Sequence, residues 1–243
     1  MLFRSSVSRA AQTVLEHYLD GVHALGAVLS ISLEHADVPA EVRALADASG
    51  DDSLARRDEP YRRALSGVYS RLATTYEVLI GRPPPRTSSL DGEPYADADA
   101  FRDDLLILER GLHAPDGQSA DDGTLKQLLR AVETFGFHLT TLDFRQNSDV
   151  HERVVAELLA GGGVEADYLS LDEGARVALL RRELANARPL SSAFLAYSAE
   201  TDSELALYRA AARVHSRYGK GGISTYVVSK AVSVSDLLEV FLL

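Results

Sequence analysis

An arginine that closes a short apolar segment is the residue of this sequence best suited to bind an anion. Arg145 follows Leu142-Asp143-Phe144 and stands shortly before a segment with helical periodicity. In parallel α/β architectures, ligands bind at the carboxyl ends of the strands. The planar guanidinium group of arginine can hold a phosphate or a carboxylate through two hydrogen bonds. We therefore predict that Arg145 is an anion anchor, and the alternative is a structural ion pair with a nearby carboxylate.

Two neighbours of Arg145 are weaker candidates for the same site. Alternate side chains of a strand point to the same face, so Asp143 is expected beside Arg145. Gln146 lies at the end of the same strand. We predict a substrate-binding group of Arg145, Asp143 and Gln146, and for Asp143 a structural role that orients the arginine is the favoured alternative. The sequence predicts no catalytic residue.

Several other kinds of site are excluded or unsupported. The chain has no cysteine, which excludes disulfides, thiolate nucleophiles and sulfur-ligated metals. Its seven histidines form neither an HExxH motif nor a pair at i, i+4, so no metal site is predicted. His151 is expected to pack or to cap a helix. The glycine-rich segments 161–163 and 219–222 do not fit the pattern of a phosphate-binding loop and are interpreted as turns.

Composition predicts a folded protein that is neither a nucleic-acid binder nor a membrane protein. Hydrophobic residues make up 46% of the 243 positions, enough for a sizeable core. The formal net charge of -11 repels nucleic acid and anionic membrane surfaces. No stretch reaches the roughly 18 apolar residues that a membrane span needs. A cytoplasmic location is therefore expected.

The first part of the chain reads as helical. Apolar residues recur at three- and four-residue spacing over 5–32, a short helix is expected after Asp37, and a third helix is predicted over 60–80. We assign 1–81 to a helical region and the Pro/Ser-rich segment 82–96 to a linker. The remainder, 97–243, is expected to hold further helices and a partial barrel.

Two segments of that remainder resemble strands. The alternation over 137–146 and the apolar run over 223–229 favour short strands, with helices before, between and after them. This order predicts parallel strands joined by helical crossovers. The fold class is therefore α/β and predominantly α-helical, with about two short parallel strands. The apolar residues at the end of the chain lead us to expect that a further element is missing there.

Three motifs give the sequence a resemblance to a known family, phosphoenolpyruvate carboxylase in its bacterial type. The first, F-G-x(5)-L-D-I-R-Q-E-S-x-x-H, is matched from Phe135 to His151, with Phe144 in place of the isoleucine and Asn147 in place of the glutamate. The second, E-L-x-x-x-R-P-L, is matched from Glu183 to Leu190. The third, Y-[IV]-I-S-M-A-x-x-x-S-D-[VL]-L, is similar to 226–238, with lysine at 230 in place of methionine. The motifs occur in the family's order.

The resemblance implies a fold and an activity. The family converts phosphoenolpyruvate and bicarbonate to oxaloacetate and phosphate with Mg²⁺ or Mn²⁺, and its subunit is a helix-rich (β/α)8 barrel, usually in a homotetramer. In that family the arginine of the D-I-R-Q strand helps to bind the substrate phosphate. This role would fall to Arg145, and the two predicted strands would belong to an incomplete barrel.

The sequence also lacks parts of the family's active site. The T-A-H-P-T segment with the catalytic histidine, the H-G-R-G-G loop and the Y-S-D-S-x-K-D segment with a metal-binding aspartate and a catalytic lysine do not occur. Since catalysis needs these groups to converge on one substrate, we expect the isolated chain to be inactive. Two alternatives are a non-catalytic helical interaction protein derived from such an enzyme and a metabolite-binding remnant of it.

Overall fold

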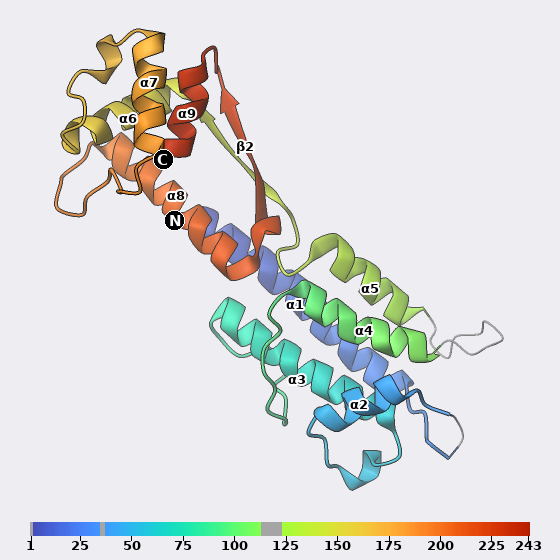
Figure 1. Cartoon of the computed structure of the whole chain (residues 1–243). Helices are drawn as coiled ribbons and strands as arrows, with labels where there is room; N and C mark the ends of the chain where they lie inside the picture. Colours follow the sequence, from blue (N-terminus) through green and yellow to red (C-terminus); the bar gives the residue numbers. More distant parts are fainter. Residues whose placement is uncertain (1, 35–36, 113–122) are drawn as a thin grey trace. The chain divides into compact units, whose positions relative to one another are not determined.

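The computed structural model describes residues 2–34, 37–112 and 123–243 (Figure 1), so most of the loop expected at 115–123 lies outside the described residues. The chain divides into two compact units. Unit 1 comprises 1–141 and 217–222, and unit 2 comprises 142–216 and 223–243. The division falls after Thr141 rather than at the Pro/Ser-rich segment 82–96.

Unit 1 is built from five α-helices and two short 3-10 helices among its described residues. The helix predicted over 60–80 is confirmed to the residue, and the short helix expected after Asp37 is found with its start at Ala40. Their bounds are α1 (Leu2–Val28), α2 (Ala40–Ala48), η1 (Leu54–Arg56), α3 (Pro60–Ile80), α4 (Ala98–Leu112), α5 (Thr124–Phe135) and η3 (Lys220–Gly222).

The core of unit 1 forms where α1 and α2 pack on α3, and where α5 packs on α1 and α4. Tyr18 of α1 is fully buried, and its hydroxyl lies 3.0 Å from the carbonyl oxygen of Ala131 and 2.9 Å from that of Gly136. The segment 82–96 forms neither helix nor strand. It is fixed to α3, because the Ser70 hydroxyl donates to the carbonyl oxygen of Leu90 at 2.7 Å.

Unit 2 contains the two strands and the helices that flank them. The strand predicted over 223–229 is confirmed to the residue, and helices lie before, between and after the two strands as expected. The bounds are β1 (Leu142–Asn147), α6 (Ser148–Gly161), η2 (Tyr168–Ser170), α7 (Glu173–Leu184), α8 (Ala199–Tyr218), β2 (Ile223–Ser229) and α9 (Val234–Leu242). The last two residues of α8 belong to unit 1.

The two strands lie side by side and run parallel, as predicted (Figure 1). Phe144 pairs with Tyr226 and Arg145 pairs with Val227 in the register. Ser224 has no partner, because the register shifts between Leu142 and Asp143. The described chain is thus a mainly helical α/β fold with one pair of parallel strands.

The start of the first strand was predicted wrongly. β1 begins at Leu142 rather than at 137, because the chain turns after α5 instead of extending. Gly136 has φ of 49° and Leu139 has φ of 67°, and the backbone N–H groups of residues 138 and 139 both donate to the carbonyl oxygen of Phe135. Phe137 and Leu139 pack into the core of unit 1. The alternation of apolar residues over 137–141 therefore reflects a turn whose apolar side chains face a helical core.

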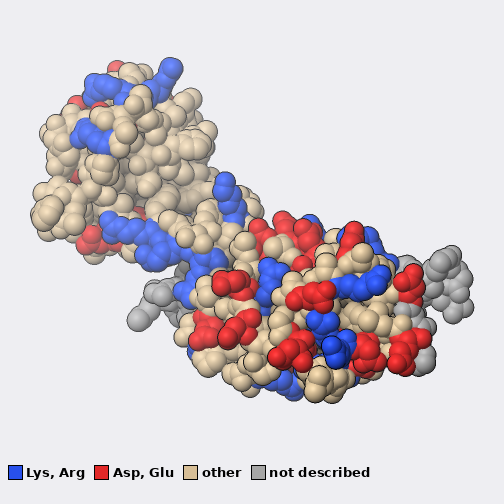
Figure 2. Space-filling model, turned by 60° about the horizontal axis from the view of Figure 1, so that its bottom comes forward, with Lys and Arg blue, Asp and Glu red and all other residues tan. Residues whose placement is uncertain are grey.

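The core of unit 2 lies between α6, α7 and α9, with Tyr168 of η2 also buried in it. α9 begins at a capping box, in which the Ser233 hydroxyl accepts from the N–H of Asp236 while the Asp236 carboxylate accepts from the N–H of Ser233. None of the helices in the described parts of the chain combines the length and the apolar character needed to cross a membrane. On the face drawn in Figure 2, acidic and basic side chains are interspersed over unit 1, whereas unit 2 shows mostly uncharged residues.

Candidate functional site

The carboxyl end of β1 presents Arg145 to solvent. Alternation along the strand buries Phe144, which is 8% exposed, and leaves the side chains of Asp143 and Arg145 exposed at 41% and 71%. α6 begins at Ser148, directly after the strand, with Asn147 as its N-cap residue. The predicted anion anchor thus stands on a strand end beside a helix N-terminus, where the peptide dipoles favour negative charge.

Asp143 lies beside Arg145, as the alternation predicts. The Arg145 Nη2 atom is 3.5 Å from Asp143 Oδ2, and this is the one ion pair that the structure gives Arg145 among the described residues. A pair this long and this exposed contributes little to stability, between zero and about 1 kcal/mol. The contact can orient the guanidinium group while leaving most of its five N–H donors directed elsewhere.

Gln146 faces the opposite side of the strand. Its Nε2 atom donates to Glu204 Oε1 of α8 at 2.7 Å, and its Oε1 atom accepts from the N–H of Asn147 at 2.9 Å. Glu204 is only 7% exposed. The structure therefore brings Asp143 and Arg145 together and directs Gln146 away from them.

The first turn of α6 adds further polar groups near the strand end. The hydroxyl of Ser148 donates to the carbonyl oxygen of Lys230 at 3.1 Å. Asp149 Oδ2 lies 3.7 Å from Arg153 and 3.8 Å from the Nζ atom of Lys230, which follows β2. Lys230 thus places a second cation after the neighbouring strand.

His151 is fully buried, as expected for a packing role. Its Nε2 atom lies 2.6 Å from the hydroxyl of Tyr226 on β2. Burial lowers the pKa of His151, against the opposing effect of Asp236 and Asp149, so the neutral ring is favoured. His151 is therefore part of the buried side of the sheet and does not face the Arg145 side.

The described residues supply no ligand set for a divalent metal. Within 2–34, 37–112 and 123–243, no group of three or more His, Asp or Glu side chains is arranged to hold a metal ion. Mg²⁺ and Mn²⁺ take several oxygen ligands, usually carboxylates and waters. The part of the chain that the structure describes thus contains no preassembled cluster of this kind.

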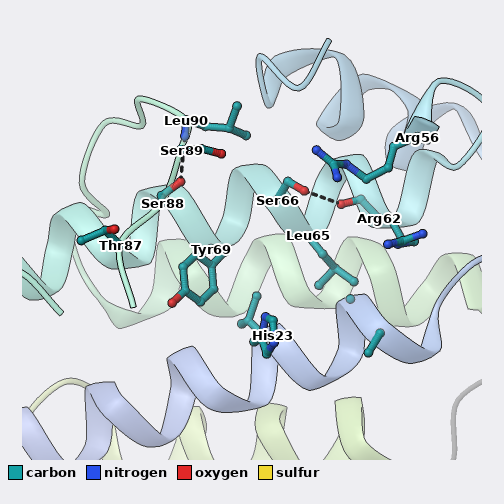
Figure 3. Close-up of a pocket in the computed structure, with 13 residues that line it drawn as sticks. His23, Arg56, Arg62, Leu65, Ser66, Tyr69, Thr87, Ser88, Ser89 and Leu90 are labelled. Carbon is teal, nitrogen blue, oxygen red and sulfur yellow. Dashed lines mark hydrogen bonds between the residues drawn. The ribbon is translucent and has the colours of Figure 1, made fainter. Parts of the chain in front are cut away.

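A cavity of about 410 Å³ in unit 1 is a second candidate for a ligand site (Figure 3). Arg56 and Arg62 line it, but both guanidinium groups are held by carboxylates. Arg56 donates to Asp51 at 2.7 and 3.0 Å, and Arg62 donates to Glu59 at 2.8 Å. Since their charge is already matched within the protein, the cavity adds no residue to the candidate site.

The sequence patterns did not identify the residues of α8 that contact the buried side of the two strands. Glu204 and Tyr208 of α8 contact Gln146 and Tyr226, respectively. Their i, i+4 spacing places them on one helix face, but such spacing is common on solvated helices and carries no functional signal by itself. Of this group, Tyr226 lies within one of the three motifs, and Gln146 lies within another.

Comparison with known proteins identifies a family. Residues 2–243 match the family model described as phosphoenolpyruvate carboxylase. A phosphoenolpyruvate carboxylase of Azoarcus sp. (strain BH72) is 48% identical over 242 residues, covering 100% of this chain and 26% of the relative. That of Aromatoleum aromaticum is 50% identical over 238 residues, and that of Burkholderia mallei (strain SAVP1) is 45% identical over 245 aligned residues, each covering 98% of this chain.

The chain spans about a quarter of the length of these curated relatives, between 25% and 26% of each. The match extends over both units and includes the strand that carries Arg145. The chain therefore belongs to the phosphoenolpyruvate carboxylase family, as a segment of such an enzyme.

Proposed function

We propose that this chain supplies the phosphate anchor of a phosphoenolpyruvate carboxylase, a lyase that carboxylates phosphoenolpyruvate with bicarbonate to give oxaloacetate and phosphate. The observation that carries the proposal is the position of Arg145. Its exposed guanidinium group stands at the carboxyl end of a parallel strand, in a member of this family. In the proposed enzyme, Arg145 holds the phosphate group and Asp143 orients the guanidinium group.

The chemistry of the substrate supports this assignment. A phosphate group offers several oxygen acceptors, and guanidinium hydrogen bonds to them are charge-assisted and can be bidentate. Transfer of the phosphoryl group to bicarbonate redistributes negative charge over its oxygens, so a fixed cation stabilises the reacting group as well as binding it. Arg145 is suited to both tasks because its only ion pair among the described residues is the long contact to Asp143.

The barrel fold, the metal ion, the location and the oligomeric state expected from the resemblance are part of the same proposal. The pair β1 and β2 would be part of a (β/α)8 barrel, completed by the remaining three quarters of the enzyme. Mg²⁺ or Mn²⁺ would be held by residues other than those described, in a cytoplasmic homotetramer. Parallel strands followed by helices are the repeating unit of such a barrel, and this supports the proposal.

Calorimetric titration with phosphoenolpyruvate tests the anchor directly. We expect Arg145→Ala to weaken binding to this chain at least tenfold, because a hydrogen bond to a charged group contributes about 1.5 to 3 kcal/mol. Arg145→Lys should give an intermediate affinity, since it keeps the charge without the bidentate geometry. Arg181→Ala, at an exposed arginine of α7, is the matched control and should leave the affinity unchanged.

A graft extends the test to the reaction. This chain would replace the matching quarter of the Azoarcus relative, and oxaloacetate formation would be followed with and without Arg145→Ala. The proposal requires a raised KM for phosphoenolpyruvate in the Arg145→Ala graft. Equal KM values in the two grafts, or equal affinities in the titration, would show that Arg145 is not the anchor.

A further inference from the structure

The buried side of the β1–β2 pair carries a chain of polar groups. Gln146 of β1 is fixed at both ends of its amide, to Glu204 Oε1 and to the N–H of Asn147. Gln146 directly follows Arg145, so a shift of its side chain would shift the strand end that carries the arginine. The amide thus connects the exposed strand end to a residue 58 positions later in the sequence.

The neighbouring strand is held from the same side. The hydroxyl of Tyr226 lies 2.6 Å from His151 Nε2 and accepts from the hydroxyl of Tyr208 at 2.9 Å. The rings of Tyr208 and Tyr226 stack with centroids 5.9 Å apart and planes 15° apart. Tyr226 in turn stacks on Phe144, its partner in the register, at 6.0 Å. Tyr226 therefore connects β2 to both α6 and α8.

One face of α8 supplies both attachments. Glu204 and Tyr208 are four residues apart, so their side chains lie on the same side of the helix. Glu204 holds β1 through Gln146, and Tyr208 holds β2 through Tyr226. Both strands thus take their position from a single helix surface.

The polar groups in this contact between α8 and the strands are not the choice that would give the chain the highest stability. Glu204 Oε2 and His151 Nδ1 are buried without a hydrogen-bond partner in the described part of the chain. A buried polar atom without a partner is unfavourable, and apolar residues of similar size would pack without that cost. Directional hydrogen bonds fix a geometry more narrowly than apolar contacts do.

We infer that Glu204 and Gln146 are positioning residues that fix the strand end carrying Arg145, with Tyr208 and Tyr226 holding the adjacent strand in the same way. This inference rests on the proposed function for its ligand, phosphoenolpyruvate. Displacement of an anchoring group by about 1 Å is enough to reduce binding and turnover strongly. The pair would therefore determine affinity without touching the substrate.

The test combines phosphoenolpyruvate titration of the full 243-residue chain with the NMR signal of the Arg145 side-chain Nε–H group. Glu204→Leu and Gln146→Leu each remove one end of the hydrogen bond. Both should weaken binding at least fivefold and shift the Arg145 signal, and the double variant should be no weaker than either single variant within a factor of two. Tyr208→Phe should shift the signal by a smaller amount in the same direction.

Conservative variants and a matched control distinguish a positioning role of Glu204 from a role in folding. Glu204→Gln keeps an acceptor for Gln146 and should bind nearly as the wild type does, whereas Glu204→Asp withdraws the acceptor and should bind several-fold more weakly. Should Glu204→Leu fail to fold, these two still decide the question. Glu200→Leu removes an exposed ion pair between α8 and Arg153 of α6, one turn before Glu204, and should change neither signal nor affinity.

Two results would overturn the inference. One is a Glu204→Leu chain that unfolds at a lower temperature but keeps the Arg145 signal and the affinity of the wild type. The other is equal binding by the Glu204→Gln and Glu204→Asp variants. Failure of the proposed function would give a different result from failure of this inference. In that case Arg145→Ala would not change the affinity for phosphoenolpyruvate, but the Glu204 variants would still shift the Arg145 NMR signal.

Discussion

Glu239 of α9 is a carboxyl group enclosed by the core of unit 2. Its side chain is fully buried, Oε1 accepts from the hydroxyl of Tyr168 at 2.8 Å, and Oε2 has no partner in the described part of the chain. Burial raises the pKa of Glu239 to about 7, and the hydrogen bond from Tyr168 opposes that rise. Asp236 and Glu152 raise the pKa further, while Arg176 lowers it.

This burial predicts a stability that falls as the pH rises. The folded chain holds the proton of Glu239 up to about pH 7, whereas the unfolded chain releases it near the ordinary value of 4.5. The free energy of unfolding therefore decreases between about pH 4.5 and 7, by roughly 3 to 4 kcal/mol at about 1.4 kcal/mol per pKa unit. Glu239→Gln imitates the protonated group, so it should match the wild type at pH 5 and exceed it at pH 8 in urea unfolding.

Glu157, whose pKa is lowered rather than raised, provides the control. Glu157 accepts hydrogen bonds from Ser198 and Thr201, and these outweigh burial and lower its pKa. Glu157→Gln should therefore destabilise the chain more at pH 7 than at pH 4. A Glu239→Gln chain that shows the same pH dependence as the wild type would contradict the assignment of that dependence to Glu239.

Lys230 carries backbone strain at a position where the family motif has methionine. Its φ is 61°, in the left-handed region that disfavours side chains with a Cβ atom by about 1 kcal/mol or more. The side chain is exposed, and its nearest charged partner is Asp149 at 3.8 Å. Lys230→Gly should raise the free energy of unfolding by about 0.5 to 1 kcal/mol.

Lys126→Gly in α5 is the control for that substitution. Glycine inside a helix costs about 1 kcal/mol, so the sign of the change should be opposite at this exposed position. Thermal unfolding followed by circular dichroism measures both variants. A loss of stability in Lys230→Gly would mean that the lysine side chain contributes more than its backbone conformation costs.

At the scale of elements, the close packing of α2 on α3 depends on a glycine. A Cβ atom at Gly67 of α3 would lie 2.6 Å from Ser49 Cβ and 2.8 Å from Ser49 Cα, at the end of α2. Backbone atoms cannot move aside without displacing the helix. Gly67→Ala should therefore lower the free energy of unfolding by about 1 to 3 kcal/mol.

Gly26 of α1 distinguishes steric crowding from helix propensity. A Cβ atom there would meet no atom within 4 Å, so Gly26→Ala should stabilise the chain by about 0.5 to 1 kcal/mol. The urea midpoints of the two variants should move in opposite directions. Equal stabilisation by both would show that α2 and α3 pack less closely than the structure indicates.

At the scale of the whole molecule, the chain forms two compact units and spans about a quarter of the length of the curated relatives that it matches. The catalytic histidine, the lysine and the glycine-rich loop expected in the family do not occur in the sequence. If Arg145 binds phosphoenolpyruvate as proposed, the substrate would meet that cation without the family's histidine and lysine, which catalysis needs to converge on the same molecule.

We therefore predict that the isolated chain forms no oxaloacetate from phosphoenolpyruvate and bicarbonate with Mg²⁺ present. A coupled assay that follows oxaloacetate reduction measures this, with the graft into the Azoarcus relative as the positive control. Metal-dependent turnover by the 243-residue chain alone would contradict the prediction.

Features that depend on neighbouring residues could be predicted from the sequence. Periodicity, turn residues and motifs predicted the helix over 60–80, the strand over 223–229, the place of Asp143 beside Arg145 and the family. Periodicity can do this because it reports which face of a local element is apolar. The tertiary structure alone decided that β1 begins at Leu142, that Gln146 faces Glu204 and that Glu239 is buried. Each of these depends on which distant segment packs against the residue, and local spacing carries no information about that.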